Sequence, residues 1–264
     1  MAGLFEKQAA TYADARPSYP KEWFAKLASL TAHHTLAWDA GTGNGQAAVS
    51  IAEHYEQVIA TDVSEAQLNH AFPHPKVRYV HTPLSTPEPD LVSILGGEGS
   101  VDLVTVAQAV HWFDLSRFYS LVNRVLRKPG GVIAVWGYNY NMGHLEDVMK
   151  RLFETTIPYW DPRAWYAFDR YRTLPFPFQG IGFGSEGDPF CLDLEQDMTF
   201  DGFLRMLKSW SAVTTAMEQG VDLLSQEVVK ELEAEWGGSS VVRRLRYEAF
   251  MLAGTPKLEN SRCS

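Results

Sequence analysis

The run from Trp38 to Gln46, W-D-A-G-T-G-N-G-Q, has the residue types best suited to holding a ligand. It follows an apolar stretch at 35–38 and precedes a helical pattern at 46–55, so we expect a strand, a glycine loop and a helix. Glycine lets the backbone turn sharply and approach a ligand closely. Because the helix begins at the loop, its unpaired N–H groups face the ligand. The loop is therefore suited to a dinucleotide or to S-adenosylmethionine.

The spacing of the glycines separates these two ligands. A dinucleotide-binding loop has the pattern G-x-G-x-x-G, whose third glycine lets strand and helix pack closely. Counting from Gly41, that glycine would fall at position 46, which is Gln46. The other two glycines are Gly43 and Gly45, and Asp39 precedes all three. This D-x-G-x-G-x-G pattern resembles motif I of the class I S-adenosylmethionine-dependent methyltransferases, and an ordinary glycine turn is the alternative.

A second acidic residue follows at the distance expected of a ribose-binding group. The short apolar run 58–61 ends at Asp62. An acid at the end of the second strand of a βαβ unit can accept hydrogen bonds from both ribose hydroxyls. Ser64 and Gln67 form a capping pair that opens the next helix. Taken alone, Asp62 could be a turn residue beside that helix, and its pairing with the glycine loop favours the ribose role.

The composition is that of an ordinary globular protein. The 264 residues are 45% hydrophobic and 21% charged, which suits one large α/β domain with an insertion or two small domains. A formal net charge of −9 without a basic cluster argues against a nucleic-acid partner. We expect a cytoplasmic protein with no membrane partner, because there is no signal-peptide pattern and no apolar run of roughly 18 residues. The two cysteines, Cys191 and Cys263, show no metal-binding spacing.

Strand and helix patterns alternate from residue 35 to about 137, which predicts a parallel sheet wound with helices. The expected third, fourth and fifth strands lie at 77–80, 101–107 and 132–136. A connection rich in proline and glycine joins the third strand to the fourth. Asp114 is the expected N-cap of the helix that follows the fourth strand.

Aromatic residues become more frequent after Gly137. Helices are expected near 143–156, 161–171, 200–213 and 221–236, and further strands at 190–194 and 242–253. The last residues read as a tail.

Four blocks of the sequence resemble the type 11 methyltransferase family. They are residues 5–20, the loop 39–45, V-D-L-V-T-V-A-Q-A-V-H-W-F-D at 101–114, and K-P-G-G-V-I at 128–133. The A-Q-A-x-H-W-F part is the most specific of them. The resemblance is closest to a small-molecule branch that includes trans-aconitate methyltransferases and the plant embryo-abundant proteins.

This resemblance implies a Rossmann-like α/β class I methyltransferase fold. The sheet would have seven mostly parallel strands with an antiparallel last strand, and a helical, aromatic-rich cap would complete the molecule. The expected division is an N-terminal cofactor-covering segment, a cofactor-binding core, a substrate cap, a C-terminal completion of the sheet and a tail, at 1–34, 35–137, 138–189, 190–254 and 255–264.

The resemblance also implies S-adenosylmethionine as the cofactor and S-adenosylhomocysteine as its product. Asp39 would order the amino group of the methionine part, Asp62 would hold the ribose, and Val63 would lie against adenine. The stretch 82–84 lacks the acid that many relatives have there, so adenine recognition would rest on backbone groups. The implied cofactor-binding residues are Tyr12, Arg16, Asp39, Gly41, Gly43, Gly45, Asp62, Val63, Leu84, Gln108 and Ala109.

His111 follows the fourth strand, at the end of the sheet where α/β folds place their sites. It could accept a proton from an attacking hydroxyl or amine, or it could be a packing and hydrogen-bonding residue. Carboxylate acceptors need no base, in which case His111 would only orient the substrate. The expected substrate-binding residues are Tyr19, His111, Trp112, Tyr138, Trp160, Trp165 and Tyr166, and no metal is expected.

The sequence thus predicts methyl transfer to an oxygen or nitrogen atom, including a carboxylate, of a small molecule. Such a transfer is an in-line displacement that needs alignment and exclusion of water rather than a protein nucleophile. The alternatives are a cofactor-binding protein with a regulatory role, methylation of a macromolecule, and a dinucleotide-dependent oxidoreductase that Gln46 argues against. We expect a monomer or a homodimer.

Overall fold

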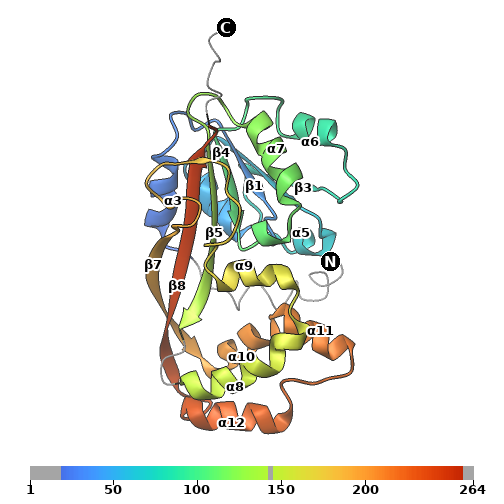
Figure 1. The fold of residues 1–264 in the computed structure, drawn as a ribbon, viewed down its shortest axis with the longest axis vertical. Coiled ribbons are helices and arrows are strands. Elements are labelled where there is room, and N and C mark those ends of the chain that lie inside the picture. Colours follow the sequence, from blue (N-terminus) through green and yellow to red (C-terminus); the bar gives the residue numbers. More distant parts are fainter. Residues whose placement is uncertain (1–18, 142–144, 258–264) are drawn as a thin grey trace.

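The protein was analysed as a computed structural model, which describes residues 19–141 and 145–257. Its core is one mixed sheet with the strand order β3-β2-β1-β4-β5-β8-β6, and β7 pairs with β8 as well (Figure 1). Strands β1 to β5 are parallel, and β8 runs antiparallel to β5. The strand bounds are Leu36–Ala40 (β1), Gln57–Asp62 (β2), Val77–His81 (β3), Leu103–Ala107 (β4), Val132–Asn141 (β5), Gln179–Gly180 (β6), Phe190–Thr199 (β7) and Val242–Thr255 (β8).

This arrangement confirms the predicted α/β fold with its antiparallel last strand. The seven expected strands are present, and the two-residue strand β6 adds an eighth member. Helices cover both faces of the parallel part. One face packs against α3 (Lys21–Ala28) and α4 (Gln46–Ala52), and the other against α6 (Glu88–Ile94) and α7 (Leu115–Val125). Helix α5 (Glu65–Asn69) connects β2 to β3.

A second lobe lies beyond the carboxyl ends of the parallel strands. Strands β5, β7 and β8 run out of the core sheet into this lobe (Figure 1). Its helices are α8 (Glu146–Thr156), α10 (Phe200–Lys208), α11 (Ser211–Glu218) and α12 (Gln226–Trp236). They share a hydrophobic core of their own, in which Phe203 stacks on Trp236. We call these four helices, with the strand ends that they cover, the cap lobe.

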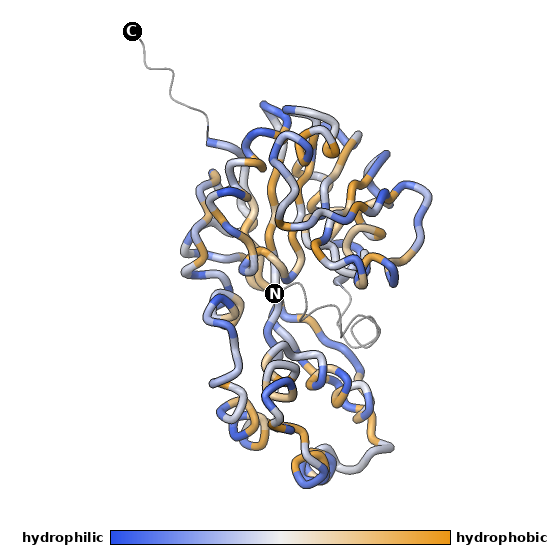
Figure 2. The backbone as a smooth tube through the Cα atoms, turned by 90° about the vertical axis from the view of Figure 1, so that its right-hand side faces the viewer, coloured by the Kyte–Doolittle hydropathy of each residue, from blue (hydrophilic) through white to orange (hydrophobic). Residues whose placement is uncertain are grey.

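Figure 2 shows the two lobes from the side, with the apolar strands at the centre of the upper lobe and apolar and hydrophilic stretches alternating along the helices of the lower lobe. Helix α9 (Trp165–Phe168) lies between the two lobes in Figure 1. Strands β1, β2 and β4 run in the same direction as β5, so their carboxyl ends also face the cap lobe. The segments that follow these strands form the site described below.

Several predicted elements match, and the differences have physical causes. Ser64 and Asp114 cap α5 and α7 as expected, accepting hydrogen bonds from the backbone N–H groups of Gln67 and Arg117. The connection rich in proline and glycine between β3 and β4 contains helix α6, for which no expectation was made; Pro87 is its N-cap and Pro89 lies in its first turn. Proline is tolerated in the first turn of a helix because the N–H it lacks has no partner there.

The predicted extents of two helices and two strands were wrong. The helix expected at 161–171 is a 3₁₀ turn, Pro162–Ala164, followed by the short α9, and the chain then turns through Arg170 and Tyr171, both at positive φ. The helix expected at 200–213 is divided into α10 and α11. Strands β5 and β7 are longer than expected because they continue into the cap lobe.

Candidate active site

The glycine loop between β1 and α4 has the conformation that only glycine adopts easily. Gly41, Gly43 and Gly45 all have positive φ, at 66°, 57° and 84°. A Cβ on Gly41 would lie 2.7 Å from the Cβ of Ala109, and one on Gly45 would lie 2.1 Å from the hydroxyl of Tyr79. A Cβ on Gly43 would meet nothing closer than 3.9 Å. The first and third glycines therefore serve packing within the protein, whereas Gly43 leaves its side open.

Asp39 lies under this loop at the end of β1 and is 1% exposed. The hydroxyl of Thr105 on β4 donates to one of its carboxylate oxygens at 2.6 Å, and that of Thr42 donates to the other at 2.6 Å. Burial raises the pKa of Asp39 to about 6, against the lowering effect of the two hydroxyls and with a further raising effect of Asp62. The carboxylate is therefore fixed in place, beneath the loop and not among the residues that line the cavity described below.

Asp62, at the end of β2, holds the glycine loop from the other side. Its carboxylate accepts the N–H of Gly43 at 2.8 Å and the N–H of Ser64 at 2.9 Å. Burial raises the pKa of Asp62, while hydrogen bonds from Ser64 and Gly43 lower it. A carboxylate oxygen accepts more than one hydrogen bond, so Asp62 retains acceptor capacity for a ligand.

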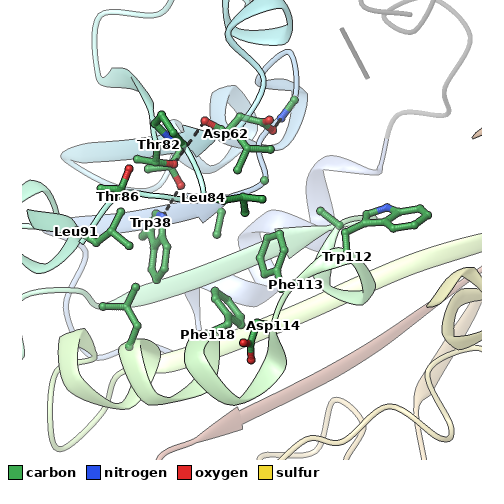
Figure 3. Close-up of a pocket in the computed structure, with 18 of the residues that line it drawn as sticks. Trp38, Asp62, Thr82, Leu84, Thr86, Leu91, Trp112, Phe113, Asp114 and Phe118 are labelled. Atoms are coloured by element: carbon green, nitrogen blue, oxygen red, sulfur yellow. Dashed lines mark hydrogen bonds between the residues drawn. The ribbon is translucent and has the colours of Figure 1, made fainter. Parts of the chain in front are cut away.

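A cavity of about 270 Å³ opens beside Asp62 (Figure 3). Pockets for small molecules begin at about this size. The wall is mainly apolar, and the cavity is bounded by the carboxyl ends of β1, β2 and β4, the loop after β3 and helix α7. Its lining includes Trp38, Gly41, Gly43, Asp62, Val63, Thr82, Leu84, Gln108, Ala109, Trp112, Phe113, Asp114, Arg117 and Phe118.

Gln108 sits at the end of β4 in a left-handed conformation, with a φ of 56°. Such a conformation is unfavourable for a residue with a side chain and is typical of functional positions. Here the backbone N–H donates to the carbonyl of Trp136 at 2.8 Å, and the side-chain amide donates to the carbonyl of Tyr138 at 3.1 Å. These bonds to β5 hold the turn that brings Gln108 and Ala109 to the cavity.

His111 is 6% exposed and is not among the residues lining this cavity. Its Nδ1 lies 3.1 Å from the hydroxyl of Tyr171, and its ring packs against Trp112 with centroids 4.8 Å apart. Burial lowers the pKa of His111 to about 3, and Arg163 lowers it further while Asp161 raises it. His111 is therefore neutral at pH 7.

The remaining predicted residues lie in different surroundings. Tyr19 and Tyr138 pack together against Trp136 and the core. Trp160 contacts Trp210 of the cap lobe and donates to the hydroxyl of Thr156. Trp165 is 46% exposed on α9, and Tyr166 packs against the core that contains α7. Tyr12 and Arg16 lie outside the described residues.

Sequence reasoning did not assign a role to several residues that the structure brings to the site. Trp38 and Phe113 line the cavity. Trp38 belongs to the glycine-loop motif and Phe113 to the A-Q-A-x-H-W-F block, but neither was given a role of its own. Thr105 lies within the fourth strand, where an isolated threonine in an apolar run was the available signal. Arg163 differs from these residues, because its sequence position did suggest pairing with a substrate carboxylate. In the structure it pairs with Asp161, donates to the carbonyl of Trp112 and lies over the Trp112 ring.

No helix in the described ranges is long and apolar enough to cross a membrane. Within the same ranges, no group of three His, Cys, Asp or Glu side chains is arranged to hold a metal ion.

Comparison with known proteins gives a consistent result. The family described as a methyltransferase domain matches residues 38–135. A protein of Dictyostelium discoideum named as a methyltransferase is 31% identical over 231 residues, which cover 84% of this chain and 81% of that protein. A solved structure of a protein from Anaeromyxobacter dehalogenans, named as a type II methyltransferase, is 35% identical with a TM-score of 0.75. The match covers 92% of this chain and 99% of that one.

A further relative, from Saccharomyces cerevisiae, is named as an S-adenosylmethionine-dependent methyltransferase. It is 30% identical over 142 residues, which cover 50% of this chain and 45% of that protein. The match to the Dictyostelium protein extends over most of both chains, and the family match includes the glycine loop, Asp62 and the end of β4. The chain belongs to the class I S-adenosylmethionine-dependent methyltransferases.

Proposed function

We propose that this enzyme transfers the methyl group of S-adenosylmethionine to an oxygen or nitrogen atom of a small molecule, carboxylates included. The observation that carries the proposal is the cavity beside Asp62 and the glycine loop, which opens at the end of the sheet that faces the cap lobe. An acceptor would enter between the lobes, where the aromatic side chains of the 138–189 segment could line its path. A partly enclosed site of this kind suits a small acceptor better than a macromolecule.

The residues present fit the cofactor. The open side of Gly43 gives a ligand access to the loop backbone. Asp39, with its pKa of about 6, would be charged at pH 7.5 and would pair with the ammonium of the methionine part. Asp62 would accept the ribose hydroxyls, and Val63, Leu84 and the apolar cavity wall would hold adenine.

The cofactor, when bound, supplies a methyl group already activated on a sulfonium sulfur. The protein therefore needs to align the acceptor and exclude water, and alignment alone can supply roughly 7–11 kcal/mol in the best intramolecular cases. Gln108 and Ala109 would fix the methionine end of the cofactor, and Trp112 would border the acceptor. We infer that His111, buried and neutral, orients the acceptor by a hydrogen bond rather than removing its proton.

Further features of the proposal rest on sequence motifs and charge. Within the family we place the chain beside the plant embryo-abundant and trans-aconitate methyltransferases, on the strength of its A-Q-A-x-H-W-F block. We also propose a cytoplasmic enzyme without a membrane partner that acts as a monomer or homodimer. The net charge of −9, without a basic cluster, argues against a nucleic-acid partner.

The test is a screen of small metabolites with cofactor carrying a labelled methyl group, read by mass spectrometry. The expected result is a labelled product from a small hydroxyl, amine or carboxylate compound, and much less of it with the Asp62→Asn variant at low cofactor concentration. Label transfer to protein or RNA alone would contradict the proposal. Tight cofactor binding with no transfer to any acceptor class would favour the alternative, a regulatory cofactor-binding protein.

A further inference from the structure

The loop from Thr82 to Thr86 forms one wall of the cavity, yet its own anchoring is slight (Figure 3). Thr82 is fixed at the start, because its N–H donates to the carbonyl of Asp62 at 2.9 Å. The turn is closed by the N–H of Thr86, which donates to the carbonyl of Pro83 at 2.8 Å. Leu84 at the tip is 74% exposed. The loop contains no acidic side chain that could accept a hydrogen bond from the adenine. Recognition of the base would therefore depend on the backbone N–H and C=O groups of the loop, whose positions must be fixed.

Arg117, on helix α7, holds this loop in place. Its guanidinium donates to the carbonyl of Thr86 at 2.8 Å and to the carbonyl of Leu84 at 3.4 Å. The backbone of Arg117 is itself held in place, because its N–H donates to the side-chain carboxylate of Asp114, the N-cap of α7, at 3.1 Å. The planar guanidinium presents its donors in a rigid fork and can hold two carbonyl groups at once. Arg117 also lines the cavity.

We propose that Arg117 is a positioning residue for the nucleoside end of the cofactor, holding the 82–86 loop and Leu84 against the adenine. This inference rests on the cofactor placement proposed above. By holding two loop carbonyls, Arg117 fixes the direction of the intervening peptide groups, and Leu84 then covers the bound base. Loss of Arg117 should therefore weaken the binding of every ligand that contains adenosine. The loss should be the same whether or not the ligand also carries the amino-acid part of the cofactor.

Methylthioadenosine provides the probe for this selectivity, because it has the adenosine and thioether of the cofactor but no ammonium or carboxylate. Calorimetry would compare it with S-adenosylhomocysteine on the wild type and on Arg117→Gln. We expect Kd to rise by about three- to tenfold for both ligands, the loss expected for one or two hydrogen bonds. Arg117→Lys, which keeps the charge but lacks the fork, should give a smaller increase. Asp39→Asn should raise Kd for S-adenosylhomocysteine alone.

Arg124→Gln is the matched control. Arg124 lies on the same helix and pairs with Glu88 and Glu98, but it does not line the cavity. It should leave both Kd values within twofold of the wild type. Hydrogen exchange should show that S-adenosylhomocysteine protects residues 82–87 in the wild type and protects them less in Arg117→Gln.

If Arg117→Gln binds both ligands as tightly as the wild type, or loses affinity only as much as Arg124→Gln does, Arg117 has no positioning role. The Asp62→Asn variant separates this outcome from failure of the cofactor placement. If Asp62→Asn loses affinity while Arg117→Gln does not, only the inference about Arg117 is wrong. If neither variant loses affinity, the placement itself is wrong.

Discussion

Asp39 and Asp62 are the residues on which cofactor binding depends most in this account. Both lie at strand ends, and burial raises the pKa of each. Asp39 is held by two hydroxyl donors and Asp62 by two backbone N–H donors, so neither carboxylate needs to reorganise when a ligand arrives. Their pKa shifts make binding sensitive to pH.

The affinity for S-adenosylhomocysteine should fall as the pH falls through about 6. Asp39 has a pKa of about 6 in the ligand-free protein, and only its charged form pairs with the ammonium of the ligand. Below that pH, Kd should rise by up to roughly tenfold per pH unit, since binding must release a proton. Calorimetry from pH 5 to 8 measures this. The Asp39→Asn variant should bind more weakly with a flatter profile; an equally steep profile would assign the titration to another group.

Asp62→Asn should weaken S-adenosylhomocysteine binding by roughly tenfold to a hundredfold, the value of a hydrogen bond to a charged group. The amide would also lose one of the two backbone contacts, to Gly43 or Ser64. Asp193→Asn, the same change at an exposed position of β7, is the control and should have no effect. An unchanged Kd in Asp62→Asn would remove this residue from the ribose site.

Turnover at saturating cofactor should show no ionisation of His111 between pH 6 and 8. Its pKa of about 3 keeps the ring neutral throughout that range. His111→Asn, which preserves a neutral hydrogen-bonding side chain, should retain more activity than His111→Ala. A limb of the kcat profile near pH 6.5 that disappears in His111→Asn would instead identify His111 as the general base, whose loss costs about 10²–10⁴ in rate.

Within the glycine loop, different glycines serve different purposes: Gly41 and Gly45 allow close packing inside the protein, whereas Gly43 leaves space for a ligand. Gly43→Ala should cost about 1–2 kcal/mol, the cost of placing a side chain at positive φ, and should weaken cofactor binding because its open side is the one a ligand would approach. Gly45→Ala adds a clash with Tyr79 and should cost about 1–3 kcal/mol more. Chemical unfolding and calorimetry measure the two effects. Equal losses of stability in both variants would contradict this division.

Local signals in the sequence predicted the elements that depend on local interactions. The capping side chains Ser64 and Asp114 marked the starts of α5 and α7, and the glycine spacing marked the loop after β1. Element lengths that depend on tertiary packing were not predictable. β5 continues to Asn141 because β8 pairs with it along its length, and no local pattern reports that pairing.

In the candidate site too, residues marked by local sequence signals could be predicted, whereas residues whose roles depend on distant contacts could not. Asp62 was predicted as a site residue because it ends a strand, whereas the roles of Asp39 and Gln108 came from the resemblance to the family. All three lie at or next to the carboxyl ends of parallel strands, which meet at one edge of the sheet. Arg117 was not identifiable, because its role depends on contacts with a loop 31 to 33 residues away in the sequence. The contact between His111 and Tyr171 spans 60 residues and depends on the path of the chain after α9.

The cap lobe has its own hydrophobic core and is joined to the rest of the molecule by strands β5, β7 and β8, which continue from the core sheet into it. Trp236→Ala should destabilise this core by about 3–5 kcal/mol, because Trp236 is fully buried against Phe203 and Phe200. Cofactor affinity should remain within twofold, since no cap-lobe helix lines the cavity. Unfolding curves and calorimetry on the folded variant test this. A collapse of cofactor binding would show that the cap lobe shapes the cofactor site.

A crystal structure of the protein with S-adenosylhomocysteine would test the cofactor placement most directly. We expect ribose hydroxyls within hydrogen-bonding distance of Asp62, the methionine part along Gly41 to Gly43 with its ammonium at Asp39, and adenine between Val63 and Leu84. Density for the ligand outside this cavity would contradict the assignment of the site. Failure to bind S-adenosylhomocysteine in crystals that take up NAD at the glycine loop would contradict the assignment of the cofactor.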